Sequence, residues 1–207
     1  MYAINEIFYT LQGEGCHSGI PAVFVRFSGC NLRCPWCDTD FAAHHPMTAE
    51  EICQTALELY DADTQGRRKM LVLTGGEPSL QVDTPLLEML HAAGFYICIE
   101  TNGTHPLPDG IDWITCSPKT KELALREVNE VKVVFTGEYD PDIWREKLSA
   151  EHWMLQPLRY TGEWLLEHEI DEWEDDRNDN LDDTVRYILA HPFWRLSLQL
   201  HKIVGLR

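Results

Sequence analysis

The sequence has few basic side chains and no long apolar run. Its 207 residues include 17 Lys and Arg against 34 Asp and Glu, which gives a formal net charge of −17 at pH 7. Nucleic acids and anionic membranes are bound through concentrated positive charge, so this balance argues against either as a direct partner. No stretch approaches the length of a membrane span, and residues 1–9 lack both the basic start and the apolar run of a signal peptide. We therefore expect a cytoplasmic protein.

The sequence also lacks internal repeats and any linker that would mark a second domain. Its hydrophobic content of 44% and charged content of 25% are ordinary for a globular protein. We expect one domain over residues 1–207, because that length supports a single substantial core. Within it, an insertion-like segment at about residues 163–183 carries eleven acidic side chains against one Arg. We interpret this segment as a solvated surface rather than as paired carboxylates that bind a metal.

Three of the seven cysteines are gathered in one loop, residues 29–39. Cys30, Cys34 and Cys37 follow a C-x3-C-x2-C spacing, and the glycine and proline of this loop disfavour both helix and strand. In a reducing compartment such cysteines are thiols or metal ligands rather than disulfides. Structural zinc sites and most iron–sulfur clusters use four protein ligands, so three cysteines leave one metal position open. A zinc knuckle completed by a distant His or Cys, or three unrelated thiols, are the alternatives that the spacing leaves.

Short apolar strands alternate with helices or brief crossovers along most of the chain. We expect strands at residues 4–9, 21–27, 70–74, 95–100, 112–116, 128–135, 152–156 and 194–200, and helices at residues 48–60, 84–94, 140–148 and 181–190. This alternation predicts an α/β fold with a parallel sheet, and too few units are present for a complete eight-unit barrel. The expected fold is therefore a shortened, partial (β/α) barrel.

Polar clusters follow several of these strands, at residues 74–78, 100–103, 117–119 and 156–157. Because the C-terminal ends of parallel strands meet at one edge, we expect these clusters to converge on a single site. Residues 11–15, Leu-Gln-Gly-Glu-Gly, form either a hairpin turn with an exposed Glu or a loop whose backbone approaches a ligand. Arg26, near the end of an alternating strand, either reaches solvent or binds an anion.

The cysteine spacing resembles the cluster loop of radical S-adenosylmethionine (SAM) enzymes, and residues 75–78, Gly-Gly-Glu-Pro, are similar to the GGEP motif of that superfamily. More narrowly, the chain resembles the 7-carboxy-7-deazaguanine synthase family over essentially its whole length. The matching segments occur in the family's order, at residues 11–15, 37–39, 74–78, 100–103, 117–119, 156–157 and 201–202. The resemblance implies the radical SAM type of partial barrel.

The resemblance also implies a reaction, which composition alone does not show. Members of this family are carbon–nitrogen lyases that convert 6-carboxy-5,6,7,8-tetrahydropterin to 7-carboxy-7-deazaguanine with loss of ammonia, on the path to queuosine and other 7-deazapurines. The implied cofactors are a [4Fe–4S] cluster, SAM and Mg2+. The implied partners are the small pterin substrate, an electron donor such as flavodoxin or ferredoxin, and a second copy of the chain in a homodimer.

Roles for single residues follow from the same resemblance. Metal binding is expected at Cys30, Cys34 and Cys37 for the cluster and at Thr39 for Mg2+. SAM binding is expected at Gly76, Glu77, Ser117, Pro118, Lys119 and Gln156. Substrate binding is expected at Leu11, Gln12, Gly13, Glu14, Arg26, Thr74, Glu100 and His201, and at Arg207 through its terminal carboxylate. An Arg suits a substrate carboxylate by paired hydrogen bonds, while Gln and Glu suit the polar edge of a pterin.

Two features depart from the family pattern. Leu158 and Arg159 follow Gln156-Pro157 where we expect an acidic continuation, and the acidic segment at 163–183 has no counterpart. Since acidic surface repels an acidic flavodoxin or ferredoxin, we expect the reductant to dock elsewhere. Two other functions stay open at this point. One is a glycyl-radical-enzyme activase of the same superfamily, and the other is a zinc-binding module without catalysis.

Overall fold

A computed structural model describes residues 1–37, 39, 44–60, 68–158 and 180–206 of the chain. One nine-stranded sheet runs through this part, in the order β3-β1-β2-β4-β5-β6-β7-β8-β9. The strands are β1 (Tyr2–Leu11), β2 (Pro21–Phe27), β3 (His45–Met47), β4 (Lys69–Gly75), β5 (Phe95–Thr101), β6 (Trp113–Cys116), β7 (Glu127–Phe135), β8 (Ser149–Pro157) and β9 (Arg195–Leu196). From β2 to β9 all neighbours are parallel, whereas β1 pairs antiparallel with both β2 and β3.

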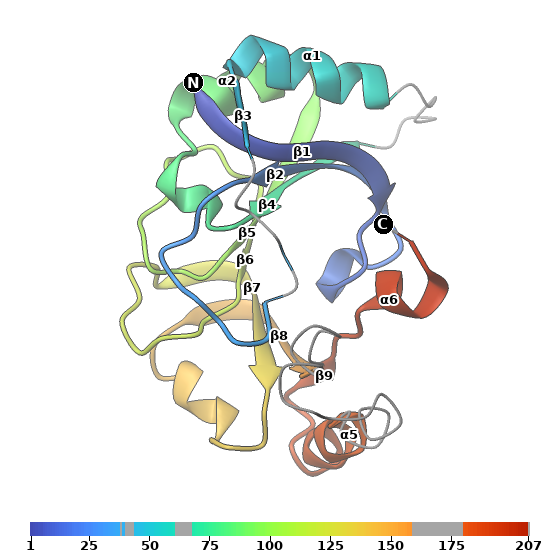
Figure 1. Cartoon of the computed structure of the whole chain (residues 1–207). Coiled ribbons are helices and arrows are strands. Elements are labelled where there is room, and N and C mark those ends of the chain that lie inside the picture. Colours follow the sequence, from blue (N-terminus) through green and yellow to red (C-terminus); the bar gives the residue numbers. More distant parts are fainter. Residues whose placement is uncertain (38, 40–43, 61–67, 159–179, 207) are drawn as a thin grey trace.

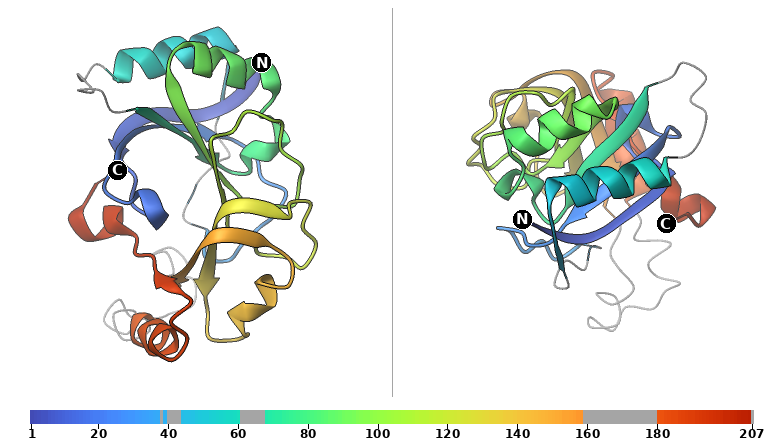
Figure 2. Two further views of the ribbon diagram at one scale, coloured as in Figure 1. Left: turned by 180° about the vertical axis from the view of Figure 1, so that it is seen from behind. Right: turned by 90° about the horizontal axis from the view of Figure 1, so that it is seen from above.

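The sheet curves without closing, as Figure 1 shows, so β3 and β9 are its two edges. This confirms the expected partial barrel. The helices are α1 (Ala49–Leu59), α2 (Thr84–Ala92), α5 (Leu181–Ala190) and α6 (Leu200–Val204), and short 3-10 turns are η1 (Gly15–His17), η2 (Pro78–Leu80) and η3 (Pro141–Trp144). In both views of Figure 2, α1 and α2 lie on the outer side of the sheet. Their apolar faces form one core with the outward side chains of β2, β4 and β5.

The first helix begins where the sequence predicts. Thr48 Oγ1 accepts from the Glu51 amide at 3.2 Å, and the Glu51 carboxylate accepts from the Thr48 amide at 2.7 Å. This reciprocal pair satisfies two amides that the helix itself leaves without partners. Cys53 lies inside the helix and is buried in the core, as expected.

Side chains on the inner face of the sheet change character along the strands. The apolar inner layer includes Phe8, Phe24, Met70, Val72 and Cys98. Two residues further along, the same faces of β2, β4 and β5 carry Arg26, Thr74 and Glu100. Because successive side chains of a strand point to opposite faces, this step of two keeps all three polar groups inside. The C-terminal ends of the strands therefore bear the polar wall.

Two expected elements differ from the structure. The helix expected at 140–148 is only the 3-10 turn η3, Pro141–Trp144, because the amides of Lys147 and Leu148 both turn back to the Trp144 carbonyl just before β8 starts. The strand expected at 194–200 is only β9, Arg195–Leu196. After it the chain leaves the sheet, and the Leu200 amide donates to the Gly13 carbonyl at 2.9 Å, so α6 starts there instead. The short edge strand β3 was not expected.

No helix in the described part of the chain is long and apolar enough to cross a membrane. Residues 163–179 of the acidic segment lie outside the described residues, as does Arg207. Asp182 and Asp183, at the end of that segment, occupy the first turn of α5. Acidic side chains stabilise this end of a helix by facing its partial positive charge.

Candidate active site

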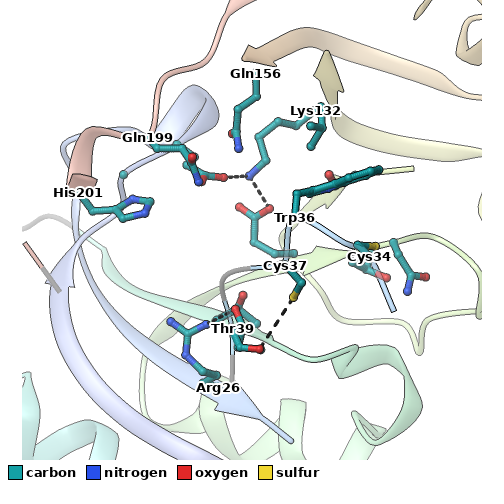
Figure 3. A pocket seen from close by; sticks show the side chains of 18 of the residues that line it. Arg26, Cys34, Trp36, Cys37, Thr39, Lys132, Gln156, Gln199 and His201 are labelled. Carbon is teal, nitrogen blue, oxygen red and sulfur yellow. Dashed lines mark hydrogen bonds and ion pairs between the residues drawn. The ribbon is translucent and has the colours of Figure 1, made fainter. Parts of the chain in front are cut away.

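A cavity of about 510 Å3 lies at the C-terminal ends of the strands. Residues from all four expected polar clusters line it, which confirms that these clusters converge. Figure 3 shows Lys132, Gln156, Gln199 and His201 around one part of this space and Arg26 beside Thr39 and Cys37 of the cysteine loop. A volume of this size suits a small-molecule ligand rather than a protein segment.

The cysteine loop forms one wall of the cavity and contains neither helix nor strand. Cys30, Cys34 and Cys37 all line the space. The loop is held by a turn in which the Cys37 amide donates to the Cys34 carbonyl at 3.1 Å, and by Asn31, whose side-chain carbonyl accepts from Asn102 Nδ2 at 3.0 Å. Asn102 follows β5, so the loop is anchored to the same sheet edge that carries the polar clusters.

The Gly-Gly-Glu-Pro segment lies directly against the cysteine loop. The Glu77 amide donates to the Gly29 carbonyl at 2.9 Å, and a Cβ at Gly76 would collide with that same oxygen. Only glycine therefore allows the two loops to pack this closely. The buried Glu77 carboxylate accepts from the Thr101 hydroxyl at 2.6 Å and from the Asn102 amide at 2.7 Å. This side chain joins the loops that follow β4 and β5.

The other four cysteines, all in the described part of the chain, lie away from the cavity wall. Cys53 is in the α1 core, and Cys16 is half-buried beside Glu130. Cys98 and Cys116 are buried, and burial raises the pKa of Cys116 to about 12. Burial also raises the pKa of Cys30 and Cys34, while Lys119 acts on both in the opposite direction. Neutral, buried thiols make poor metal ligands, so the fourth cluster ligand has no cysteine source at the wall.

The donor set at the cavity fits a [4Fe–4S] cluster with one iron left for another ligand. Three thiols come from one loop, and a histidine at the wall, His201, lies on the opposite side of the cavity beside Gly13. Within the described residues no three His, Cys, Asp or Glu side chains are already grouped as a metal site.

A buried lysine that the sequence analysis missed joins two carboxylates in the cavity. Lys132 Nζ lies 2.5 Å from Glu14 Oε2 and 2.9 Å from Glu100 Oε2, and dashed lines mark both contacts in Figure 3. Burial disfavours the charged form of Glu14, but Lys132 and Gln199 outweigh it and lower the pKa of Glu14 to about 2. Burial raises the pKa of Glu100 above its usual value despite Lys132. Gln12 Nε2 donates to the second Glu100 oxygen at 3.2 Å.

The Leu-Gln-Gly-Glu-Gly segment connects the antiparallel strands β1 and β2 and also forms a wall of the cavity. Glu14 is not exposed as a simple hairpin turn would leave it, because its side chain is 17% exposed and paired with Lys132, so the ligand-facing interpretation is the better one. A Cβ at Gly13 would collide with the His201 imidazole. Gly15 has φ 65°, and a Cβ there would collide with the Glu130 carboxylate, which accepts from the Cys16 amide at 2.8 Å. The segment therefore needs glycine at both positions to receive α6 on one side and β7 on the other.

Arg26 is oriented by a carboxylate outside the cavity. Its Nε donates to Glu6 Oε1 at 2.9 Å, and its NH1 donates to Thr39 Oγ1 at 3.3 Å. The ion pair is partly exposed and contributes little stability, but it directs the guanidinium toward Thr39. The Thr39 hydroxyl is a hard oxygen donor, and Mg2+ commonly takes only one or two ligands from protein, so this side chain fits the expected role.

Most of the expected site residues lie on the cavity wall. These are Leu11, Gln12, Gly13, Glu14, Arg26, Cys30, Cys34, Cys37, Thr39, Thr74, Gly76, Glu77, Glu100, Ser117, Lys119, Gln156 and His201. Pro118 is buried and is not part of the wall, and Arg207 lies outside the described residues. The sequence analysis missed Trp36, Lys132, Gln199 and Lys202, which also line the cavity. For Lys132 a signal existed, since a charged residue alternates with buried valines in β7.

Comparison with known proteins agrees with this geometry. The sequence profile of the Radical SAM superfamily matches residues 24–123, which include the cysteine loop and the Gly-Gly-Glu-Pro segment. The 7-carboxy-7-deazaguanine synthase of Bacteroides thetaiotaomicron is 49% identical over 208 residues and covers 100% of both chains. The synthase of Bradyrhizobium diazoefficiens is 42% identical, covering 100% of this chain and 99% of the relative. The crystal structure of QueE from Escherichia coli has a TM-score of 0.69 at 27% identity, covering 97% of this chain and 94% of that one.

The profile match and the three-cysteine wall of a partial barrel together define a radical SAM enzyme. The relatives that match from end to end narrow this class further. The chain belongs to the 7-carboxy-7-deazaguanine synthase family.

The three-thiol site predicts a clear difference between two cysteine variants. Cys34→Ala removes a cavity thiol, whereas Cys53→Ala removes a core thiol far from the wall. After anaerobic reconstitution we expect about four irons and four sulfides per chain in the Cys53→Ala variant and a loss of most of both in the Cys34→Ala variant. Iron and acid-labile sulfide analysis measures this. Full iron in the Cys34→Ala variant, or zinc in place of iron in the parent protein, contradicts the assignment.

Proposed function

We propose that this protein converts 6-carboxy-5,6,7,8-tetrahydropterin to 7-carboxy-7-deazaguanine with loss of ammonia, in the biosynthesis of queuosine and other 7-deazapurines. The proposal depends on one observation: a single small-molecule cavity combines a three-cysteine loop with a wall that is acidic near Glu14 and Glu100 and basic at Arg26. The substrate is complementary to this wall, because it carries N–H donors on its pterin edge and a carboxylate at C6. An activase needs a groove for protein, and neither this cavity nor the full-length relatives favour it.

The cofactors have matching residues on the wall. Cys30, Cys34 and Cys37 would hold the cluster. SAM would lie beside the Gly76 backbone, with Ser117, Lys119 and Gln156 at its polar groups. Thr39 would give one oxygen to Mg2+, and the substrate would give others. When bound, the cluster and SAM supply the one-electron chemistry that removes hydrogen from C6 of the substrate, and the protein orients the reactants and excludes water.

The chain's own polar groups orient the substrate. Glu14, Glu100 and Gln12 accept from or donate to the pterin edge, and Arg26 pairs with the carboxylate. His201 covers the opposite side, because α6 is hydrogen bonded to the segment after β1.

The remaining proposals concern the surroundings of the enzyme. An acidic one-electron donor such as flavodoxin or ferredoxin reduces the cluster, and the protein acts as a cytoplasmic homodimer. Seven cysteines without a disulfide, all of them in the described residues, are consistent with a reducing compartment. The whole chain forms one radical SAM domain, since a single sheet extends from Tyr2 to Leu196.

The activity itself is tested by an anaerobic assay with the substrate, SAM and dithionite. We expect 7-carboxy-7-deazaguanine and ammonia in equal amounts, identified by mass spectrometry and an ammonia assay. Absence of the deazaguanine from a preparation with a full cluster refutes the proposal. Transfer of a radical to a glycyl-radical protein under the same conditions identifies an activase instead.

Replacement of Arg26 tests how the substrate carboxylate is bound. Arg26→Gln removes a charged partner, and one charge-assisted hydrogen bond is worth about 1.5–3 kcal/mol, so we expect the KM for the pterin to rise at least about tenfold. The matched control is Arg186→Gln on the exposed face of α5, which should leave KM unchanged. Steady-state kinetics measure both variants. An unchanged KM in the Arg26→Gln variant shows that Arg26 does not bind the substrate carboxylate.

Neutral substitutions in the acidic segment test where the reductant docks. Replacing the five Asp and Glu of residues 171–176 by Asn and Gln removes repulsion toward an acidic donor. We expect turnover with reduced flavodoxin to stay equal or become faster, while turnover with dithionite is unchanged. Slower turnover with flavodoxin alone shows that the segment takes part in docking.

A further inference from the structure

We propose that Lys132 is a positioning residue that keeps the carboxylates of Glu14 and Glu100 in their substrate-binding arrangement and links them to the segment that closes the cavity. The inference rests on the proposed function, because it concerns how the pterin edge is bound. It assigns a role to a side chain of β7 that neither the motifs nor the family resemblance singled out.

The first argument is geometry. Lys132 Nζ bridges Glu14 Oε2 at 2.5 Å and Glu100 Oε2 at 2.9 Å, and its side chain is only 6% exposed. Glu14 comes from the loop after β1 and Glu100 from the end of β5, so the two carboxylates belong to separate elements. Lys132 is the common contact that fixes the distance between them. Both carboxylates and the ammonium group line the cavity.

The second argument is charge. Glu14, Glu100 and Glu130 surround Lys132 from three elements, and His201 of α6 acts on Glu14 from the far side. Burial alone would lower the pKa of Lys132, but Glu100 and Glu14 raise it above its usual value, so the side chain stays charged. Without this cation, three carboxylates would share a water-poor space. At least one would then take up a proton, so that one of its oxygens becomes a donor and no longer accepts from an N–H group of the substrate.

The third argument is the link to α6. The second Glu14 oxygen accepts from Gln199 Nε2 at 3.0 Å, and Gln199 Oε1 accepts from Lys202 Nζ at 3.0 Å. On the other side, Gln12 donates to Glu100 and accepts from the Glu14 amide at 3.2 Å. A single line of contacts therefore runs from the end of β5 through Lys132 to the first turn of α6. Loss of the lysine should disturb both the substrate wall and its closure.

The experiment compares Lys132→Met with Lys132→Arg, and uses Lys121→Met as the matched control on an exposed loop. The probe is 6-carboxypterin, a fluorescent oxidised analogue of the substrate, titrated into reconstituted enzyme with SAM from pH 6 to pH 9. We expect the Lys132→Met variant to bind at least about tenfold more weakly at pH 7. Burial already raises the pKa of Glu100, and losing the cation raises it further, so a larger share of this carboxylate is protonated at low pH in the variant and rising pH restores the ionised form. Affinity should therefore recover toward pH 9.

The Lys132→Arg variant keeps the charge and should keep the pH profile of the parent enzyme, and the Lys121→Met variant should match the parent throughout. If the Lys132→Met variant loses the same affinity at every pH, Lys132 has only a structural role and the proposal is overturned. Normal affinity with a reduced kcat also overturns it, because the ammonium group would then act on the reacting atoms. If the parent enzyme itself fails to bind 6-carboxypterin and forms no product, the proposed function fails and not only the role of Lys132.

A second variant covers the case in which the Lys132→Met protein does not fold. Gln199→Leu removes the hydrogen bond from Gln199 Nε2 to Glu14 Oε1 and leaves Lys132 in place. We expect faster cleavage by trypsin after Lys202 and weaker binding of 6-carboxypterin. Protection of Lys202 and affinity equal to those of the parent enzyme refute the link between the carboxylates and α6.

Discussion

The active site depends on one constraint, which is the two-residue period of side chains along parallel strands held in register. The apolar layer beneath the cavity includes register partners from β2, β4 and β5, namely Phe24, Val72 and Cys98. The next inward residues are Arg26, Thr74 and Glu100. Since each strand residue advances about 3.3 Å, the polar wall stands about 7 Å above this layer. A slip of one residue in any strand would exchange a polar group for an apolar one.

Close packing at two glycines positions the loops of the site relative to the strands. Gly76 lies against the carbonyl of Gly29, which fixes the start of the cysteine loop relative to β4. Gly13 receives the ring of His201, which fixes α6 relative to β1. A Cβ at either glycine would collide with its neighbour, so the absence of a side chain at these two positions helps to place the wall of the cavity.

Local signals predicted the fold well, and long-range contacts account for the errors. Periodicity and the capping box of Thr48 and Glu51 placed most strands and the first helix, because those signals act within a few residues. The final strand was wrong because a contact between Leu200 and Gly13, far apart in the sequence, pulls the chain away from the sheet. Lys132 was missed for the same reason. Its partners Glu14 and Glu100 lie 118 and 32 residues away in the sequence. The sequence around Lys132 therefore does not show that it pairs with two carboxylates.

The cavity wall is less acidic than the chain as a whole. The net charge is −17, yet four cations, Arg26, Lys119, Lys132 and Lys202, line the cavity beside three carboxylates, Glu14, Glu77 and Glu100. At physiological ionic strength the field of exposed charges is screened within about 8 Å, whereas cations at a partly buried wall are screened much less. An anionic substrate at the wall therefore meets these nearby cations more strongly than the acidic surface. The cations on the wall therefore suit the carboxylates of the proposed pterin substrate and of SAM despite the acidic chain.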